Sequence, residues 1–226
     1  MATLDRPILI PRAPAVGWRR WVPNAITLAR LVLSLLLFVQ LSLWEPSRTG
    51  KPDWPLVLAA LSFTVAAVTD AADGYFARRW NAITRFGRIM DPFADKMLVV
   101  GAFVLMAGPA FHHPLPDGTR HQVTGIMPWM VVVILGRELF VTSIRGVLES
   151  EGRDFSAMAT GKVKMVIQAV AVPVILVLLA IVETPRGSWA TAAIGATAWA
   201  VVAVTVASVV PYAIRGFAAI NGSRTP

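Results

Sequence analysis

The 226-residue sequence contains no cysteine. This excludes disulfide bonds and thiolate metal ligands, so any metal site must be built from oxygen and nitrogen atoms. Charged residues are also scarce, at 15%, whereas apolar residues reach 56%. Because soluble proteins typically contain about 25% charged and about 45–50% apolar residues, the composition indicates a membrane protein.

Residues 1–22 lack the apolar stretch of a signal peptide, so we expect this segment to remain in the chain. The segment is basic and ends in W-R-R-W at residues 18–21, which suits the headgroup level of a membrane; a disordered tail is the alternative. The net charge of +8 lies near the ends of apolar runs and forms no stripe, so we expect no nucleic-acid partner.

Six apolar segments are long enough to cross a bilayer, which requires roughly 20 residues. They are residues 23–44, 54–80, 86–107, 127–149, 161–182 and 189–217. The connection at 108–125 contains three histidines, which could bind a metal or lie in a solvated loop: His112, His113 and His121.

The distribution of basic residues predicts the topology. Of the 21 Lys and Arg, 14 fall in the N-terminal segment, in residues 78–88 and 145–164, and near the C-terminus. The positive-inside rule assigns these regions to the cytoplasm. The sequence therefore predicts an all-α polytopic integral membrane protein with six transmembrane helices and both termini cytoplasmic. Its membrane domain comprises residues 23–217, between a juxtamembrane segment at 1–22 and a short tail at 218–226.

Four aspartates lie within apolar sequence in residues 70–95. Asp70 and Asp73 share one helix face, and Asp91 and Asp95 share another, because the members of each pair are three or four residues apart. Both pairs lie roughly 10 residues from the polar turn near Asn81, so an antiparallel hairpin would bring them to the same height. This geometry predicts a divalent-metal site.

A metal site would also explain how these aspartates are tolerated in a membrane, where a charge at the bilayer centre costs at least about 2.5–3.5 kcal/mol. Carboxylates without histidine or cysteine favour Mg²⁺ or Mn²⁺ over zinc, and such sites bind diphosphates. Gly74, Ala77 and Gly87 keep the nearby helix surface small, and Arg78 can donate to phosphate. For each glycine alone, helix packing is the alternative.

These residues form the pattern D-x2-D-G-x2-A-R-x8-G-x3-D-x3-D, met here at every fixed position. The pattern resembles the signature of the CDP-alcohol phosphotransferases. The resemblance implies a six-helix membrane enzyme, commonly a homodimer, that moves a substituted phosphate from a CDP-linked donor to an alcohol and releases CMP. It implies two divalent ions bound by Asp70, Asp73, Asp91 and Asp95, with Asp95 as the base for the acceptor hydroxyl, and a CDP pocket at Gly74, Ala77, Arg78 and Gly87.

The start of the first apolar segment extends the resemblance. Residues 23–30 read P-N-A-I-T-L-A-R and are similar to the P-N-x-x-T-x-x-R opening common in the family. Asn24 and Thr27 could hydrogen-bond the nucleotide or the donor phosphate, although Asn24 could instead cap the helix. Arg30 is an intramembrane arginine, for which we expect a partner.

The fourth and fifth segments narrow the resemblance. Gly136-Arg137-Glu138 and residues 161–168 are similar to bacterial phosphatidylglycerophosphate synthases, although Met165 stands where those enzymes often have threonine. Arg137 and Glu138 could neutralise each other or contribute to a site. Four cations near the predicted cytoplasmic ends could be membrane anchors or a pocket for a phosphate-bearing acceptor: Arg145, Lys162, Lys164 and Arg215.

The resemblance therefore predicts phosphatidyl transfer from CDP-diacylglycerol to sn-glycerol 3-phosphate at the cytoplasmic face of a bacterial inner membrane. We also expect an apolar groove open to membrane lipids near residues 54–80. The nearest alternative uses another acceptor, such as inositol phosphate or phosphatidylglycerol. A cation-coupled transporter is the alternative from another class, because intramembrane carboxylates also mark ion pathways. A purely structural subunit would leave the four aspartates unexplained.

Overall fold

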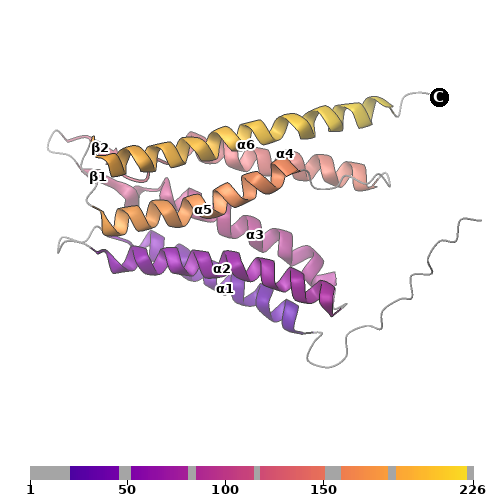
Figure 1. Ribbon diagram of the computed structural model, residues 1–226, viewed down its shortest axis with the longest axis horizontal. Helices are drawn as coiled ribbons and strands as arrows, with labels where there is room; N and C mark the ends of the chain where they lie inside the picture. Colours follow the sequence, from indigo (N-terminus) through magenta and orange to yellow (C-terminus); the bar gives the residue numbers. More distant parts are fainter. Residues whose placement is uncertain are drawn as a thin grey trace, which may run out of the picture.

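The computed structural model describes residues 21–45, 52–80, 85–114, 118–150, 159–182 and 187–222. Within these ranges the chain forms six long helices, a short 3₁₀ helix and two short strands (Figure 1). The long helices are α1 (Val22–Ser42), α2 (Trp54–Arg79), α3 (Arg85–Met106), α4 (Pro128–Ser150), α5 (Ala159–Ile181) and α6 (Trp189–Gly222). Their bounds follow the six predicted segments closely, except that α6 continues past residue 217. Residues 1–20, for which we predicted a basic juxtamembrane segment, lie outside the described ranges.

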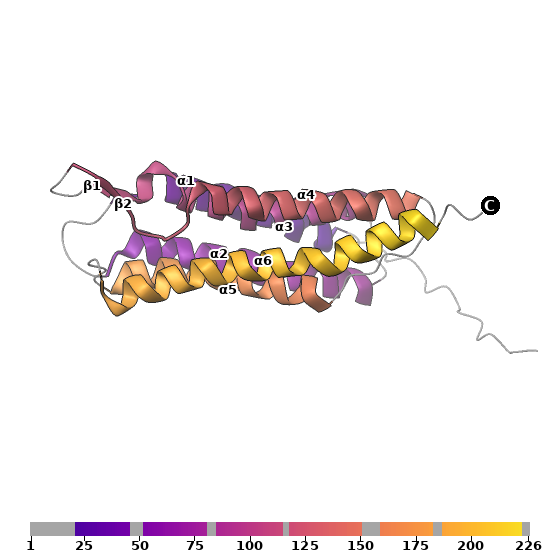
Figure 2. The same ribbon diagram turned by 90° about the horizontal axis from the view of Figure 1, so that it is seen from above.

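The six helices form two layers of three. In Figure 2, α1, α3 and α4 lie in one layer, and α2, α5 and α6 lie in the other. Contacts join α1 to α3 and α3 to α4 within the first layer, and α2 to α5 and α5 to α6 within the second. The pairs α1–α2, α2–α3, α3–α5 and α4–α6 connect the layers. The all-α expectation is therefore confirmed for the described ranges, apart from a small two-stranded hairpin.

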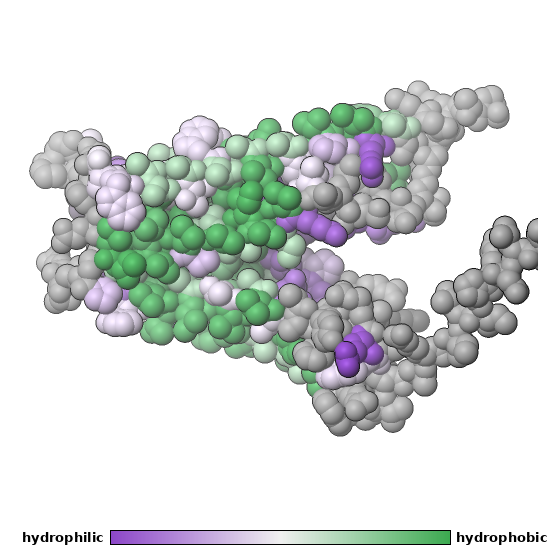
Figure 3. Space-filling model, in the orientation of Figure 1, coloured by the Kyte–Doolittle hydropathy of each residue, from purple (hydrophilic) through white to green (hydrophobic). Residues whose placement is uncertain are grey.

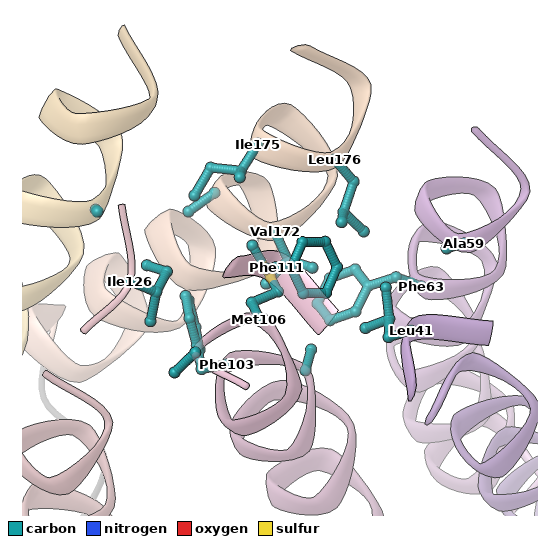
Figure 4. Packing of buried hydrophobic residues seen from close by; sticks show 14 of the residues in the cluster. Leu41, Ala59, Phe63, Phe103, Met106, Phe111, Ile126, Val172, Ile175 and Leu176 are labelled. Atoms are coloured by element: carbon teal, nitrogen blue, oxygen red, sulfur yellow. The ribbon is translucent and has the colours of Figure 1, made fainter. Parts of the chain in front are cut away.

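The apolar core fills the half of the bundle next to that hairpin. Large buried side chains there include Phe63 of α2, Phe103 of α3 and Val172 of α5, all 0% exposed (Figure 4). The three described aspartates of residues 70–95 lie toward the other end of α2 and α3. The bundle is thus closed by hydrophobic packing at one end, and polar side chains gather at the other.

Large apolar side chains also cover the outside of the bundle, as expected for a protein surrounded by lipid. Examples are Leu61, Val132 and Trp199, each more than half exposed, and Figure 3 shows a broad hydrophobic surface. Three helices are long and apolar enough to cross a membrane by composition: Asn24–Ser42, Thr160–Ile181 and Trp189–Ala218. A shorter apolar stretch, Trp54–Asp70, ends where the acidic residues of α2 begin. The protein is therefore an all-α membrane protein.

The connection between α3 and α4 is more ordered than the solvated loop we considered. It contains the 3₁₀ helix η2 (Pro109–Phe111) and the antiparallel strands β1 (His112–Pro114) and β2 (Arg120–Gln122). Phe111 is fully buried and stacks on Trp44, with 4.7 Å between the ring centroids. His113 also stacks on Trp44. Within the described ranges, no three metal-ligating side chains gather here.

Asp53 links the helices at this end of the bundle. Its carboxylate is 3% exposed, accepts a hydrogen bond from Trp44 Nε1 at 3.1 Å, and accepts a longer one at 3.4 Å from the backbone N–H of Leu56. The second contact caps the first turn of α2. The backbone N–H of Asp53 also donates to the carbonyl of Ala180 at 2.7 Å, so one residue connects α1, α2 and α5.

Replacing Asp53 by alanine should therefore lower the free energy of unfolding by about 2 kcal/mol, through the lost cap and the unpaired indole N–H. Thermal unfolding in detergent, followed by circular dichroism, measures this as a lower midpoint. Glu45→Gln, which removes an exposed carboxylate at the same end, serves as the control. An equal midpoint for Asp53→Ala and the control would contradict the assigned role.

Candidate active site

One face of α1 contacts Asp70 of α2 and Asp91 of α3. Thr27 and Arg30 are 1% and 0% exposed, although both are polar and lie in an apolar helix. Arg30 Nη1 forms an ion pair with Asp70 Oδ1 of α2. Thr27 Oγ1 donates a hydrogen bond to Asp91 Oδ1 of α3 at 2.7 Å. Arg30 thus has the partner that we expected for an intramembrane arginine.

These two contacts place Asp70 and Asp91 at nearly the same height. Thr27 and Arg30 are three residues apart on α1, which corresponds to about 4.5 Å along the helix axis. Their acidic partners lie on α2 and α3, which are consecutive in the chain and run antiparallel. The juxtaposition that the spacing predicted is therefore present for Asp70 and Asp91.

Part of the predicted site cannot be placed in this way. The side chains of residues 71–78 and the turn at 81–84 lie outside the described part of the chain, which includes Asp73, Gly74, Ala77 and Arg78. Gly87 is buried on α3. Asn24 lies inside the first turn of α1, whose N-cap residue is Trp21, so the prediction that Asn24 might cap this helix is wrong.

Asp95 lines a polar cavity of about 530 Å³ between the two layers. The cavity wall comes from α3, α4, α5 and α6. Figure 3 shows hydrophilic residues around a hollow at the end of the molecule away from the hairpin. Asp95 therefore faces a space large enough for a small polar substrate, next to the helix face that carries Asp91.

Three of the four predicted acceptor-binding cations line this same cavity: Arg145, Lys162 and Lys164. The Nε atom of Arg145 is buried and has no hydrogen-bond partner within the described ranges. Arg215 is exposed on α6 and is not among the cavity-lining residues. The charged residues that line the cavity are three carboxylates and five cations, an excess of positive charge that suits an anionic ligand: Asp95, Glu138, Glu149, Lys96, Arg137, Arg145, Lys162 and Lys164.

Arg137 and Glu138 of α4 form an ion pair, as one of our interpretations predicted. Arg137 Nη1 lies 3.1 Å from Glu138 Oε1, and Lys164 Nζ pairs with the same oxygen. Arg137 Nε also donates to Ser208 Oγ at 3.0 Å, and its guanidinium lies over the ring of Tyr212. This network connects α4, α5 and α6 at the cavity wall.

Gly161 allows α5 and α6 to approach closely beside this network. A Cβ atom at residue 161 would lie 2.6 Å from the Tyr212 hydroxyl oxygen. Such a contact is too short for any side chain. The glycine therefore leaves room for the Tyr212 hydroxyl in the cavity wall.

An apolar groove of about 500 Å³ adjoins the polar cavity. It runs along α3 from Phe93 to Leu105 and is bounded by Phe38 of α1 and Leu135 of α4. Lys96 and Glu138 line both the groove and the polar cavity, so the two spaces meet there. We expected a lipid-accessible groove near residues 54–80, whereas this one lies beside α3.

Sequence reasoning missed several polar residues of this region. Lys96 follows Asp95 directly and contacts Thr142 of α4. Tyr212 is one of only two tyrosines, and Gln168 donates to Thr205 Oγ1 at 3.1 Å between α5 and α6. A detectable signal was present, since each is a polar side chain within a long apolar segment.

The predicted metal ligands are only partly described. Among the side chains that the structure describes, no three of His, Asp or Glu gather closely enough to hold a metal ion. Asp73, the fourth predicted ligand, is not among those side chains. Asp70, Asp91 and Asp95 offer the hard oxygen donors that Mg²⁺ and Mn²⁺ prefer. The donor chemistry of these residues therefore fits such an ion.

Comparison with known proteins identifies the family. The family model described as CDP-alcohol phosphatidyltransferase matches residues 20–212. A Bacillus subtilis (strain 168) protein named CDP-diacylglycerol--glycerol-3-phosphate 3-phosphatidyltransferase is 35% identical over 160 residues, covering 69% of this chain and 76% of that protein. An Escherichia coli (strain K12) protein of the same name is 36% identical over 152 residues, covering 66% and 73%. The match to the family model includes α2 and α3, which carry the four aspartates, and all the residues that line the polar cavity. This chain therefore belongs to the CDP-alcohol phosphatidyltransferase family.

Proposed function

We propose that this protein transfers a phosphatidyl group from CDP-diacylglycerol to sn-glycerol 3-phosphate, giving phosphatidylglycerol phosphate and CMP. The observation that carries the proposal is that Asp95 and the cations Arg145 and Lys162 line one cavity. An acceptor with both a hydroxyl and a phosphate matches that combination. The names of the Bacillus subtilis and Escherichia coli relatives agree with this choice of donor and acceptor.

In the proposed reaction, the carboxylate of Asp95 accepts the proton of the acceptor hydroxyl. The hydroxyl oxygen then forms a bond to the lipid-bearing phosphorus of the donor. The phosphorus–oxygen bond to CMP breaks, and CMP leaves with the bonding electron pair. Asp95 suits the role of base because it lies on α3 one turn after Asp91 and also lines the polar cavity proposed for the acceptor.

The donor nucleotide would lie between α1 and the aspartates of α2 and α3. Asp70, Asp73, Asp91 and Asp95 would hold two divalent ions, Mg²⁺ or Mn²⁺, which neutralise diphosphate charge when bound. Asn24, Thr27, Gly74, Ala77, Arg78 and Gly87 would form the CDP pocket. The hydrogen bond from Thr27 to Asp91 and the ion pair from Arg30 to Asp70 would orient these carboxylates, as outer partners commonly do at metal sites.

The acceptor phosphate would bind to Arg145 and Lys162 in the cavity, with Lys164 beside them. The buried Nε of Arg145 supports this assignment because it would gain a hydrogen-bond acceptor there. We leave Arg215 out of the pocket because it is not among the residues that line the cavity.

One acyl chain of the donor would lie in the apolar groove beside α3. From Phe93 to Leu105 the helix rises about 18 Å, similar to the hydrocarbon thickness of one leaflet. Because the groove meets the polar cavity at Lys96 and Glu138, a lipid tail could enter it while the reacting phosphate stays near Asp95.

We further propose that all six helices span a bacterial cytoplasmic membrane, with both termini and the active site at the cytoplasmic face. Each helix has at least 21 residues, or about 31 Å, enough to cross the hydrocarbon core. The positive-inside distribution of Lys and Arg supports this orientation. A homodimer is part of the proposal on the family resemblance.

Replacing Asp91 by asparagine should reduce turnover on the order of 100-fold, because it removes an anionic oxygen donor from the proposed metal site. The assay is CMP release from CDP-diacylglycerol and glycerol 3-phosphate in a Mg²⁺ titration. EDTA should abolish activity of the wild-type enzyme, and added Mg²⁺ or Mn²⁺ should restore it. Glu45→Gln is the control for charge, and full activity of Asp91→Asn would rule out the metal assignment.

Replacing Lys162 by alanine should raise the KM for glycerol 3-phosphate about 10-fold, the usual loss for one charge-assisted hydrogen bond. The KM for CDP-diacylglycerol should stay unchanged. Arg120→Ala removes an exposed cation from the hairpin end and serves as the control. An unchanged acceptor KM in Lys162→Ala would argue against the assigned pocket and in favour of a neutral acceptor.

Replacing Val104 by tryptophan should fill the groove beside α3. We expect the KM for a dioleoyl donor to rise about 10-fold, since burial of two to three methylenes would be lost. A dioctanoyl donor should be affected less. Val132→Trp, at a lipid-exposed position of α4, is the matched control. Equal effects on both donors would exclude an acyl chain, and a change of oligomeric state would point to a second copy of the chain in the groove.

A further inference from the structure

Glu138 lies where three spaces meet. Its side chain lines the polar cavity, the apolar groove, and a third, small cavity of about 20 Å³. The side chain is 12% exposed, and those of its two cationic partners, Arg137 and Lys164, are each 7% exposed. A nearly buried carboxylate requires cationic partners, because burying an unpaired charge is costly.

The two cations depend on Glu138 to different degrees. Arg137 is also held by α6, through the hydrogen bond to Ser208 and the ring of Tyr212. The hydrogen bond described for Lys164 runs to Glu138. The position of the Lys164 ammonium group is therefore determined mainly by this one carboxylate.

The small cavity connects this ion pair to the proposed base. Asp95, Glu138, Lys164 and Gln168 all line it, and its volume would accommodate one water molecule with several polar partners. Lys164 also lines the large polar cavity together with Asp95. The Lys164 ammonium group thus lies in the wall of the polar cavity, next to the place where the acceptor hydroxyl and Asp95 would meet.

Loss of the Glu138 charge would leave two cations close together in a nearly buried place. Arg137 is fixed by α6, so Lys164 is the partner that would move or lose its proton. In either case the cavity would lose a positioned cation next to Asp95, although Arg145 and Lys162 would be unaffected.

We infer that Glu138 is a positioning residue for the acceptor: it holds the Lys164 ammonium group in the cavity wall beside Asp95, where it binds the phosphate-bearing alcohol. This inference rests on the proposed function, since it assigns Lys164 to the acceptor and not to the CDP moiety. In this inference Glu138 acts on the acceptor through Lys164.

A double-mutant cycle tests the inference. Glu138→Gln and Lys164→Gln should each raise the KM for glycerol 3-phosphate about 10-fold, the loss expected for one charged hydrogen bond, and leave the KM for CDP-diacylglycerol unchanged. The double variant should be no worse than Lys164→Gln, because Glu138 acts through Lys164. Glu45→Gln, which removes an exposed carboxylate at the opposite end of the bundle, is the control and should keep the wild-type acceptor KM.

Three outcomes would overturn the inference. If the rise in acceptor KM in the double variant equalled the product of the two single rises, Glu138 would act independently of Lys164. An equal rise in the donor KM would mean a general structural role. If Glu138→Gln does not fold, an unchanged acceptor KM in Lys164→Gln would still be decisive, because no other group is proposed to transmit the effect.

A measurement without turnover separates this inference from the proposed function. An amine-reactive reagent followed by peptide mapping should modify Lys164 slowly in the wild-type enzyme and about 10-fold faster in Glu138→Gln, once the charged hydrogen bond is lost. Lys162, exposed on the same helix, is the internal reference. Equal labelling in both proteins would refute the positioning role, whereas a wild-type enzyme inactive with glycerol 3-phosphate would refute only the acceptor.

Discussion

The ion pair between the buried Arg30 and the partly exposed Asp70 is the interaction on which the polar half of this protein depends. Breaking such a pair by removing one partner typically costs about 3–5 kcal/mol, because an uncompensated charge remains buried. Arg30 is fully buried, so its charge requires the carboxylate of α2 to stay at that height. Thr27, one turn earlier, holds Asp91 of α3 in the same way. A single face of α1 thereby fixes the relative height of the two helices that carry the acidic motif.

The two ends of the bundle meet different physical requirements. Next to the β1–β2 hairpin, large buried apolar side chains and the Asp53 contacts hold the helices together. At the other end, the layers separate enough to enclose the polar cavity, and ion pairs replace part of the apolar packing. An enzyme acting on a lipid needs both conditions at once, since a rigid apolar half can keep the polar groups in place.

The sequence predicted the helices well and the site in part. Apolar segment length located all six helices, because a bilayer-spanning element has a narrow range of lengths. Spacing along the helices predicted that Asp70 and Asp91 lie at a similar height, and both contact one turn of α1. It could not predict that α1 supplies their partners, or that Arg215 is not among the residues lining the cavity, because contacts between distant helices depend on packing angles that local periodicity does not encode. The ordered hairpin with Phe111 stacked on Trp44 was missed for the same reason.

The Glu138 side chain lines the polar cavity, the apolar groove and the third, small cavity. A membrane enzyme of this kind must bring a water-soluble anion and a lipid to the same phosphorus atom, so a polar cavity and an apolar groove have to share a boundary. In this protein the boundary consists of Lys96 and Glu138. The carboxylate neutralises cations that face the cavity, and its helix presents apolar side chains to the groove. Charge compensation at that boundary therefore lowers the cost of placing charges beside the apolar groove, while the cavity keeps the positive charge that an anionic acceptor requires.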